Sequence, residues 1–468
     1  MQYVSTRGEA PVLGFADVLL AGLARDGGLY VPAEWPEFSA AEIRAMRGLS
    51  YSDLAVRLLN PFLGDEIASA DFERIVREAY GTFRHRAVCP LTQIGDNRFL
   101  LELFHGPTLA FKDVAMQLLG RLMDHVLTER DRRATIVGAT SGDTGGAAIE
   151  AFAGRERADI FILFPHGRVS AVQQRQMTTS TASNVHALAV DGNFDDCQNL
   201  VKALFNDLAF RDRVGLSGVN SINWARIMAQ IVYYFSSALS LGSPDRPVSF
   251  TVPTGNFGDI FAGYAAKKMG LPIERLVIAT NDNDILARTL ATGRYAMEGV
   301  VATSSPSMDI QISSNFERLL FEAYRRDASA VRTAMAGLRQ SGAFTVEEKA
   351  LAAIRAEFDA GASAMEETAE TIASTLRHSE YLLDPHTATG VRVAERFAKH
   401  ETPMIILATA HPAKFPDAVA EASGMRPPLP LWLADLMDRP ENFARLPSEP
   451  KSVEEYIANR TRAVRQGV

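Results

Sequence analysis

The 468-residue chain has little cysteine, and this excludes several classes of protein. Its two cysteines, Cys89 and Cys197, lie far apart in the sequence, so they provide neither a disulfide framework nor the spacing of a metal site. Such sparse cysteine agrees with a reducing compartment, and we interpret both residues as small buried hydrophobic side chains. We therefore expect a cytoplasmic protein.

A basic patch and a membrane-directed segment are also lacking. The formal net charge is −8, and the longest basic run is only Arg130-Asp131-Arg132-Arg133, which argues against a nucleic-acid partner. The N-terminal residues have no apolar core of a signal peptide. The most membrane-like stretch, 225–241, contains Arg226, Gln230 and three serines, so it predicts a buried helix and not a membrane span. We expect neither nucleic acid nor a membrane among the partners.

Several familiar catalytic and cofactor motifs are absent. The nine histidines include no His-x3-His pair, and there is no cysteine cluster, so no metal site is expected. The dinucleotide pattern Gly-x-Gly-x-x-Gly and the nucleoside-triphosphate pattern Gly-x4-Gly-Lys-Ser/Thr do not occur. There is also no Gly-x-Ser-x-Gly nucleophile elbow, which argues against a hydrolase of that type.

The sequence pattern changes near residue 96, from mostly helical to alternating strand-like and helical segments. Residues 1–95 read as a mostly helical N-terminal domain, and the length of the chain fits two or three domains. From Phe99 onward, short β-branched runs alternate with helical ones, which predicts an α/β fold of parallel sheets flanked by helices on both faces. The expected strands are 135–137, 160–164, 185–190, 248–252, 276–279 and 404–408.

The helices expected between these strands complete the domain assignment. They are 145–153, 170–177, 195–207, 224–241, 260–269 and 284–290. We assign residues 96–215 to a smaller α/β domain and residues 216–468 to a larger one. A stretch rich in Ala, Glu and Arg near 316–377 predicts a helical insertion without strands in the larger domain.

One lysine stands at an unusual place in this pattern. After Pro107 and a possible N-cap Thr108, apolar residues recur at helical spacing, which places Lys112 in the first turn of a helix. A helix N-terminus disfavours a cation by about 0.3 to 1 kcal/mol, and partial burial beside Phe111 and Met116 adds to this effect. The amine is then pushed toward the neutral form that a Schiff base with a carbonyl cofactor requires. The alternative is an exposed lysine whose stem covers apolar surface.

Two glycine-rich loops, each between a strand and a helix, could bind anions. In the first, 138–146, small residues allow close approach of a ligand, and hydroxyls at Thr140, Ser141 and Thr144 suit a carboxylate or phosphate. In the second, 253–259, the N–H groups point along a helix dipole. A single loop of this kind could be only a tight turn packed on a helix. Two loops with Lys112 indicate a phosphorylated cofactor and an anionic substrate.

Ordered motifs along nearly the whole chain point to a known family. They are 3–8, 26–32, 104–113, 138–145, 220–226, 253–259, 305–316, 384–390 and 409–415. Together they resemble the threonine synthases, pyridoxal-phosphate enzymes of fold type II, the tryptophan synthase β-like fold. The resemblance implies the last step of threonine biosynthesis, in which O-phospho-L-homoserine and water give L-threonine and phosphate. It is compatible with a monomer or a small homo-oligomer.

The resemblance also implies roles for individual residues. Lys112 matches the Schiff-base lysine and proton shuttle, and Thr409 matches the hydroxyl that faces the pyridine nitrogen of the cofactor. The loop 140–144 matches the one that holds the substrate carboxylate and orients the cofactor ring. The loop that binds the cofactor phosphate is matched by Gly255, Asn256, Phe257, Gly258 and Asp259.

Two points stay open in this comparison. The wider fold usually places Asn beside the phenolic oxygen of the cofactor, whereas this chain has Asp143, as in one branch of threonine synthases. An anionic Asp cannot donate a hydrogen bond to a phenolate, so either a proton is shared or Asp143 points elsewhere. The phosphate of the substrate is expected to contact one of four side chains, which are not ranked: Ser141, Thr144, Asn256 and Arg226.

Two alternatives to a threonine synthase are compatible with parts of this pattern. One is a related lyase of the same fold, either a phospholyase or a hydroxyamino-acid dehydratase. The other, from a different class, is a non-catalytic paralogue that binds phosphate ligands. Such a paralogue should have lost the lysine, and Lys112 is present.

Overall fold

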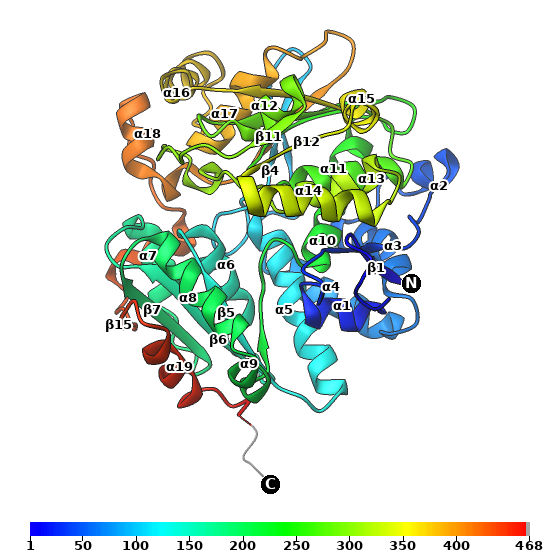
Figure 1. The fold of residues 1–468 in the computed structure, drawn as a ribbon. Helices are drawn as coiled ribbons and strands as arrows, with labels where there is room; N and C mark the ends of the chain where they lie inside the picture. Colours follow the sequence, from blue (N-terminus) through cyan, green and yellow to red (C-terminus); the bar gives the residue numbers. More distant parts are fainter. Residues whose placement is uncertain (465–468) are drawn as a thin grey trace.

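Two separate β-sheets organise the computed structural model, which describes residues 1–464 (Figure 1). The smaller sheet lies at the lower left of Figure 1, and all its neighbouring strands are parallel, in the order β15-β7-β6-β5-β8. Every residue of β6 is buried, as expected for a strand of a parallel sheet covered on both faces. Its strands are β5 (Ala134–Ala139), β6 (Ala158–Pro165), β7 (Val185–Asp191), β8 (Leu216–Ser217) and β15 (Ala444–Pro447).

Helices pack around the smaller sheet and connect its strands. The helix α6 follows β5 directly, so the glycine-rich loop between them lies at the carboxyl edge of the sheet. The helices of this part are α6 (Asp143–Phe152), α7 (Ala171–Thr178), α8 (Phe194–Asn206), α9 (Leu208–Val214) and α19 (Pro450–Ala458).

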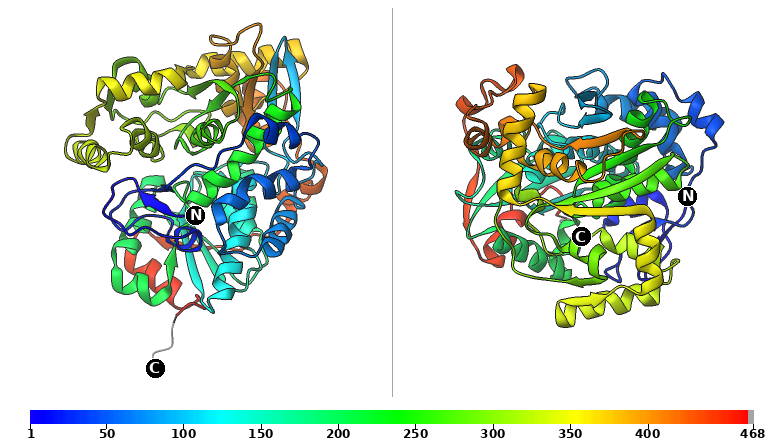
Figure 2. Two further views of the ribbon diagram at one scale, coloured as in Figure 1. Left: turned by 90° about the vertical axis from the view of Figure 1, so that its right-hand side faces the viewer. Right: turned by 90° about the horizontal axis from the view of Figure 1, so that it is seen from above.

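The larger sheet forms the upper half of the molecule, as both Figure 1 and the left view of Figure 2 show. Its order is β13-β10-β9-β14-β4-β3, and all pairs are parallel except the hairpin β3–β4. Its strands are β3 (Leu91–Gly95), β4 (Arg98–Glu102), β9 (Val248–Pro253), β10 (Ile273–Thr280), β13 (Phe358–Ala362) and β14 (Met404–Ala408). Its helices are α11 (Gly258–Lys268), α12 (Ile285–Thr292), α15 (Glu348–Glu357), α16 (Met365–Ser379), α17 (Pro385–Ala394) and α18 (Pro416–Ser423).

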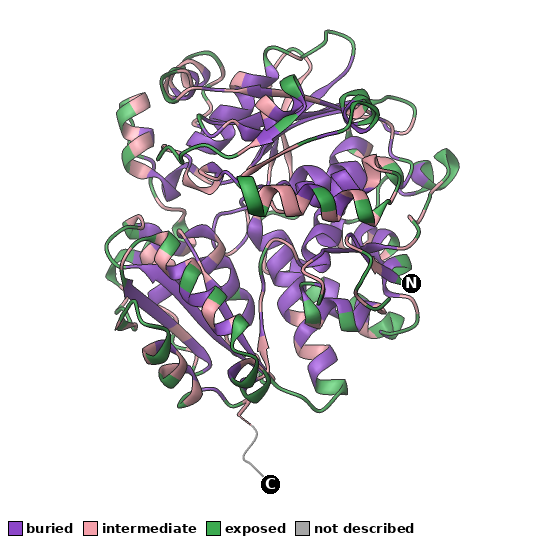
Figure 3. Ribbon diagram, in the orientation of Figure 1, coloured by how far each residue is buried: buried purple, intermediate pink, exposed green. Residues whose placement is uncertain are grey.

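Two long helices, α5 (Lys112–Glu129) and α10 (Trp224–Ser240), run through the centre and are buried over most of their length (Figure 3). The N-terminal helices pack against them on the right of Figure 1, as expected for a mostly helical N-terminal part. These elements are β1 (Tyr3–Ser5), α1 (Phe15–Ala21), β2 (Tyr30–Pro32), α2 (Ala40–Ala45), α3 (Tyr51–Leu63) and α4 (Ser69–Tyr80).

The remaining elements line the front of the molecule and the connections between the two halves. The short strands β11 (Arg294–Ala296) and β12 (Ala343–Thr345) pair with each other, and the helices α13 (Phe316–Ala323) and α14 (Ala328–Ser341) lie between them in the chain. The 3-10 turns are η1 (Pro306–Met308), η2 (Pro412–Lys414), η3 (Leu431–Leu433) and η4 (Leu436–Asp438).

Each strand and helix expected from residue 135 onward is present, with bounds that differ by a few residues. The expectation of helices without strands in 316–377 is wrong, because β12 and β13 lie there. The sequence of β13, Phe-Asp-Ala-Gly-Ala, has no β-branched residue, so its pairing with β10 at the sheet edge is a tertiary effect.

The two sheets do not follow the order of the chain. The strands β3 and β4 belong to the larger sheet, whereas β15, near the carboxyl end, joins the smaller one. The boundaries expected near residues 95 and 215 stay a prediction for folding units, but each sheet combines strands from both sides of them. Among the helices of residues 1–464, none has the length and apolar character needed to cross a bilayer.

Candidate functional site

Lys112 is the first residue of α5, which confirms its expected place in the first helical turn. The expected N-cap is wrong, because the helix is preceded by Phe111 and not by Thr108. Between Thr108 and the helix, Leu109 has a left-handed backbone with φ of 62°, and Ala110 forms a short antiparallel bridge with Ala410. Thr108 instead donates hydrogen bonds from its N–H and its hydroxyl to the carboxylate of Asp113, both at 2.7 Å.

The amine of Lys112 lies in an almost closed environment. The residue is 8% exposed, and its Nζ lies 3.3 Å from Asp143 Oδ2 and 3.4 Å from Ser307 Oγ. Burial lowers the pKa of the Lys112 amine, the negative charge of Asp143 opposes this, and the positive charges of Lys414 and Arg226 reinforce it. The amine can therefore lose its proton more easily than an exposed lysine, as a covalent bond with a carbonyl group requires.

Asp143, the first residue of α6, connects this amine to a second lysine. Its Oδ1 lies 3.1 Å from Lys414 Nζ and accepts a hydrogen bond from Gln173 Nε2 at 3.0 Å. Burial alone would raise the pKa of Asp143, but the positive charges of Lys414 and Lys112 hold it well below its usual range. Asp143 is thus an ionised hydrogen-bond acceptor.

The three hydroxyl groups of the first glycine-rich loop, 138–146, fall into two groups: one bonds to the loop itself and two do not. Thr140 Oγ1 accepts hydrogen bonds from the N–H groups of Gly142 and Gly145, both at 2.9 Å, so this hydroxyl shapes the loop itself. Ser141 and Thr144 are partly exposed, and within residues 1–464 their hydroxyls make no hydrogen bond. These two hydroxyls are the ones available to a ligand.

In the second glycine-rich loop, 253–259, the backbone N–H groups at the start of α11 are accessible. Phe257 has a left-handed backbone with φ of 63° and precedes α11, while its side chain packs against Phe316 in the core. A Cβ atom at Gly255 would lie only 2.6 Å from the carbonyl oxygen of Ser307, so a larger residue does not fit. Asn256 is exposed. The backbone N–H groups at this helix start are therefore open to an anion.

Asp259, at the end of the same loop, points into the core. Its Oδ1 accepts hydrogen bonds from the hydroxyls of Tyr233 and Tyr234, while its Oδ2 is buried and has no hydrogen-bond partner within residues 1–464. Burial raises the pKa of Asp259 to about 7. Asp259 supports the loop from below and is not itself exposed to a ligand.

Ser307 joins the two loops and the lysine. Its Oγ lies 3.4 Å from both Lys112 Nζ and Asp143 Oδ2, and its carbonyl oxygen closes over Gly255. Its N–H donates to His386 Nε2 at 3.3 Å, so Nδ1 of His386 carries a proton and donates to Asp384 Oδ1 at 2.9 Å. The lysine and both loops therefore meet at one place, as the sequence predicted.

Arg226 and Thr409 also have groups that the protein leaves unused. Arg226 is buried and donates from Nη1 to the carbonyl oxygen of Val219 at 3.2 Å, but its Nε has no partner within residues 1–464. Burial lowers the pKa of Arg226 to about 10. Thr409 is buried, its backbone pairs with Phe111 and Thr387, and its hydroxyl makes no hydrogen bond in that part of the chain.

Several polar residues at this site were not predicted from the sequence. Ser307, Asp384, His386 and Lys414 all lie in segments singled out as motifs, but nothing local marks them as neighbours of Lys112. The one available signal was Lys414 itself, because a lysine inside the mostly apolar run Ala410-His411-Pro412-Ala413-Lys414-Phe415 needs buried partners.

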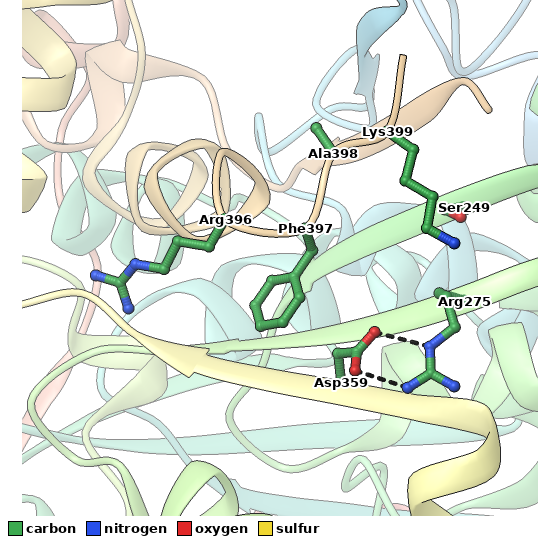
Figure 4. A pocket seen from close by; sticks show the side chains of 7 residues that line it. All are labelled: Ser249, Arg275, Asp359, Arg396, Phe397, Ala398 and Lys399. Atoms are coloured by element: carbon green, nitrogen blue, oxygen red, sulfur yellow. Dashed lines mark hydrogen bonds and ion pairs between the residues drawn. The ribbon is translucent and has the colours of Figure 1, made fainter. Parts of the chain in front are cut away.

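A separate hollow of about 480 Å³ lies at the opposite edge of the larger sheet (Figure 4). Its cations are already paired: Arg275 holds Asp359 through two hydrogen bonds of 2.7 and 2.6 Å, and Arg396 and Lys399 pair with Glu367 and Glu274. The hollow is lined by Ser249, Arg275, Asp359, Arg396, Phe397, Ala398 and Lys399. Within residues 1–464, the charged side chains that line this hollow are paired, in contrast to the unpartnered Arg226 Nε near Lys112.

The residues around Lys112 fit a phosphorylated aldehyde cofactor. They offer a buried amine, a glycine cradle that a Cβ would fill, an unpartnered Arg226 Nε and a free Thr409 hydroxyl. Residues 90–407 match the model of the pyridoxal-phosphate-dependent enzyme family. The protein is therefore an enzyme of this class and uses pyridoxal phosphate, as expected.

The segments on either side of residues 90–407 show which family of pyridoxal-phosphate enzymes the chain belongs to. Residues 2–80 match the threonine synthase N terminus, and residues 387–457 match the threonine synthase C-terminal domain. The chain belongs to the threonine synthase family. This confirms the expected family, the fold type II architecture and the expected lyase activity of a threonine synthase.

Individual relatives agree over the full length. The threonine synthase of Pseudomonas aeruginosa is 55% identical over 460 residues, which are 98% of each chain. A crystal structure of pyridoxal-phosphate-bound threonine synthase from Brucella melitensis is 71% identical with a TM-score of 0.97, covering 99% of this chain and 100% of that one. A crystal structure of threonine synthase from yeast is 42% identical with a TM-score of 0.93, covering 97% and 98%.

Proposed function

We propose that this enzyme converts O-phospho-L-homoserine and water to L-threonine and phosphate, with Lys112 as the residue that holds the cofactor covalently. The observation that carries the proposal is the placement of the Lys112 amine. It is buried, its pKa is lowered, and it lies between Asp143 and Ser307, whose carbonyl oxygen closes over Gly255. The proposal thus depends on one buried lysine beside one glycine cradle.

Several groups would hold the cofactor in this arrangement. The backbone N–H groups from Gly255 to Asp259 suit its phosphate, and the free hydroxyl of Thr409 suits the pyridine nitrogen. We assign the ionised Asp143 to the Lys112 nitrogen and not to the phenolic oxygen, because a carboxylate can only accept hydrogen bonds. When bound, the cofactor supplies an electron sink for carbanions formed on the substrate.

Lys112 is the base and acid of the proposed reaction. Its amine, freed by the amino group of the substrate, takes the α proton and must pass that proton on to the electron sink that the cofactor would supply. Only then is it neutral again and able to take the β proton, after which phosphate leaves from the γ carbon. Water then adds at the β carbon, and Lys112 returns protons. The hydrogen bonds to Asp143 and Ser307 keep the nitrogen close to these carbons between transfers, which is the positional requirement of general acid–base catalysis.

The substrate needs two anion sites. We assign its carboxylate to the loop 140–144, where Ser141 and Thr144 have free hydroxyls while Thr140 is occupied with the backbone of the loop. Its phosphate has four candidate partners, Ser141, Thr144, Asn256 and Arg226. Arg226 is favoured because it is a cation with an unpartnered Nε, and a guanidinium can bind phosphate oxygens through two parallel hydrogen bonds.

Water must reach the reaction only at a late step. Lys112 is nearly inaccessible, so a substrate can enter only if the two sheet regions or the N-terminal part move. We propose that these parts close over the bound substrate, as lids do in other enzymes that exclude early side reactions. We further propose a cytoplasmic enzyme that is a monomer or a small homo-oligomer, which light scattering measures directly.

Product analysis tests the proposed reaction. The purified protein, loaded with pyridoxal phosphate, is incubated with O-phospho-L-homoserine, and threonine, inorganic phosphate and keto acid are quantified. We expect threonine and phosphate in equal amounts. Keto acid without threonine would assign the protein to a dehydratase or phospholyase, and bound cofactor without any product would assign it to a non-catalytic ligand-binding protein.

A further inference from the structure

Lys414 is a completely buried lysine whose three polar contacts are all built by the protein. Its Nζ donates to the carbonyl oxygen of Thr108 at 2.7 Å and to Gln176 Oε1 at 2.8 Å, and it lies 3.1 Å from Asp143 Oδ1. An ammonium group has three N–H donors, and here each has an acceptor. Lys414 is therefore held as a cation in one fixed orientation.

The carboxylate of Asp143 lies between this cation and the amine of Lys112. Its Oδ1 faces Lys414, and its Oδ2 faces Lys112 at 3.3 Å. Gln173, which donates to Oδ1 at 3.0 Å, fixes the carboxylate further. The two charges nearest to the Lys112 nitrogen along this line are thus the negative charge of Asp143, in contact, and the positive charge of Lys414 on the other side of that carboxylate.

Other charges also face this cluster, and each comes from a different element. Arg226 adds a positive charge near Lys112, and His386 lies beside Asp143. Asp259, with a pKa of about 7, adds a negative charge at higher pH. Asp113 and His411 also feel the charge of Lys414. The groups and their places are Asp113 of α5, Asp143 of α6, Arg226 of α10, Asp259 of α11, His386 of α17, His411 just before η2, and Lys414 of η2.

We propose that Lys414 is a positioning residue for the reaction: it holds the carboxylate of Asp143 in place and offsets part of its negative charge, so that the Lys112 nitrogen releases its proton more easily than it would beside Asp143 alone. An unaccompanied aspartate in contact with Lys112 would bind the ammonium form too strongly. The inference rests on the proposed function of Lys112, and it explains why this chain can have Asp where the wider fold usually has Asn.

The test follows the protonation of the Lys112 nitrogen without measuring activity. The visible absorption of the cofactor-loaded protein is recorded across pH, and the midpoint of its change is compared between variants. Lys414→Met should raise the midpoint by about one to two pH units, the size expected for one nearby charge at an effective dielectric constant of about 20. Asp143→Asn should lower the midpoint, because it removes the negative charge.

The same substitution is also made in Asp143→Asn protein, so that the test does not depend on a single variant that could fold poorly. In Asp143→Asn protein, adding Lys414→Met removes a buried unpaired cation, so the double variant should be more stable than Asp143→Asn alone and its midpoint should again be higher. Lys414→Arg, which keeps the charge, should stay closer to wild type than Lys414→Met. Lys202→Met, on an exposed face of α8, is the matched control and should leave the midpoint unchanged.

Competitive acetylation of the cofactor-free protein gives an independent readout. Trace acetic anhydride labels only neutral amines, so labelling of Lys112 should require a higher pH in Lys414→Met than in wild type. Equal midpoints in wild type and Lys414→Met, in both backgrounds, would overturn the inference. So would an unchanged midpoint with a raised KM for the phosphate ester, which would assign Lys414 to direct substrate contact.

The order of experiments separates this inference from the proposed function. Borohydride treatment of the wild-type holoenzyme is done first, and the modified lysine is identified by peptide mapping. Modification of another residue would refute the role of Lys112, whatever Lys414 does. Modification at Lys112 with no effect of Lys414 on the midpoint would leave the proposed function intact and refute only the inference.

Discussion

Gly255→Ala tests whether the glycine cradle and the lysine form one site. The added methyl group would lie 2.6 Å from the carbonyl oxygen of Ser307 and 3.5 Å from the Cα atom of Met308. An ordinary carbon–oxygen contact is about 3.3 Å, so one of the two segments must move by roughly 0.7 Å. Because Ser307 Oγ lies 3.4 Å from Lys112 Nζ, this movement is transmitted to the amine.

The expected size of the effect follows from this displacement. A misplacement of about 1 Å lowers turnover by up to roughly a hundredfold, so we expect Gly255→Ala to lose about ten- to a hundredfold in kcat/KM. Overpacking should also reduce the free energy of unfolding by about 1 to 3 kcal/mol. Phosphate release measures turnover, titration of the cofactor absorption measures cofactor affinity, and thermal unfolding measures stability.

Gly299→Ala is the matched control for this substitution. A methyl group added at Gly299 would have no neighbouring atom within 4 Å, and the backbone there is not left-handed, so an alanine should behave like wild type. The reasoning would be refuted if Gly255→Ala bound the cofactor and turned over substrate as well as Gly299→Ala does.

Three further substitutions probe the support of the site. Burial raises the pKa of Asp259 to about 7, above its unfolded value, so its contribution to stability is present at pH 4 and is lost as the pH rises through 7. In cofactor-free protein, Asp259→Asn should remove this pH-dependent loss of unfolding free energy, which is at most about 4 kcal/mol. Urea unfolding of both proteins across pH measures it, and the same pH dependence in wild type and Asp259→Asn would contradict the expectation. Glu317→Ala leaves Arg7 and Thr6 without their acceptor and should reduce the free energy of unfolding by about 2 to 4 kcal/mol, whereas a loss below about 0.5 kcal/mol would argue against this contact. His386→Ala frees the N–H of Ser307 and should lower kcat about tenfold relative to the exposed control His378→Ala, and equal rates would show that the contact is unimportant.

Local sequence patterns predicted those features of the site that depend on residues close together in the sequence. The helical spacing of apolar residues placed Lys112 at a helix start, and glycine content located both loops that meet beside it. Anion binding by these loops stays a prediction. Thr108 is not the N-cap, because Leu109 after it has a left-handed backbone and Ala110 pairs with Ala410, a residue far away in the sequence. No pattern within a few residues can report such a contact.

The same limit explains what else the sequence did not reveal. The strand β13 forms because β10 offers a free edge, not because Phe358–Ala362 favours a strand. The environment of Lys112 depends on Lys414 and Ser307, which are brought to it by η2 and η1 from distant parts of the chain. The state of Asp143 stayed open in the sequence for this reason, since the positive charges of Lys414 and Lys112 together hold its pKa low.

The central claim is that the cofactor is bound covalently to Lys112, and one measurement tests it most directly. The holoenzyme is reduced with borohydride, digested, and analysed by mass spectrometry beside Lys112→Ala. The account predicts loss of the visible absorption and a cofactor-derived mass on the peptide that contains Lys112. A cofactor-derived mass on Lys414 or another lysine, or the same mass in Lys112→Ala, would contradict it.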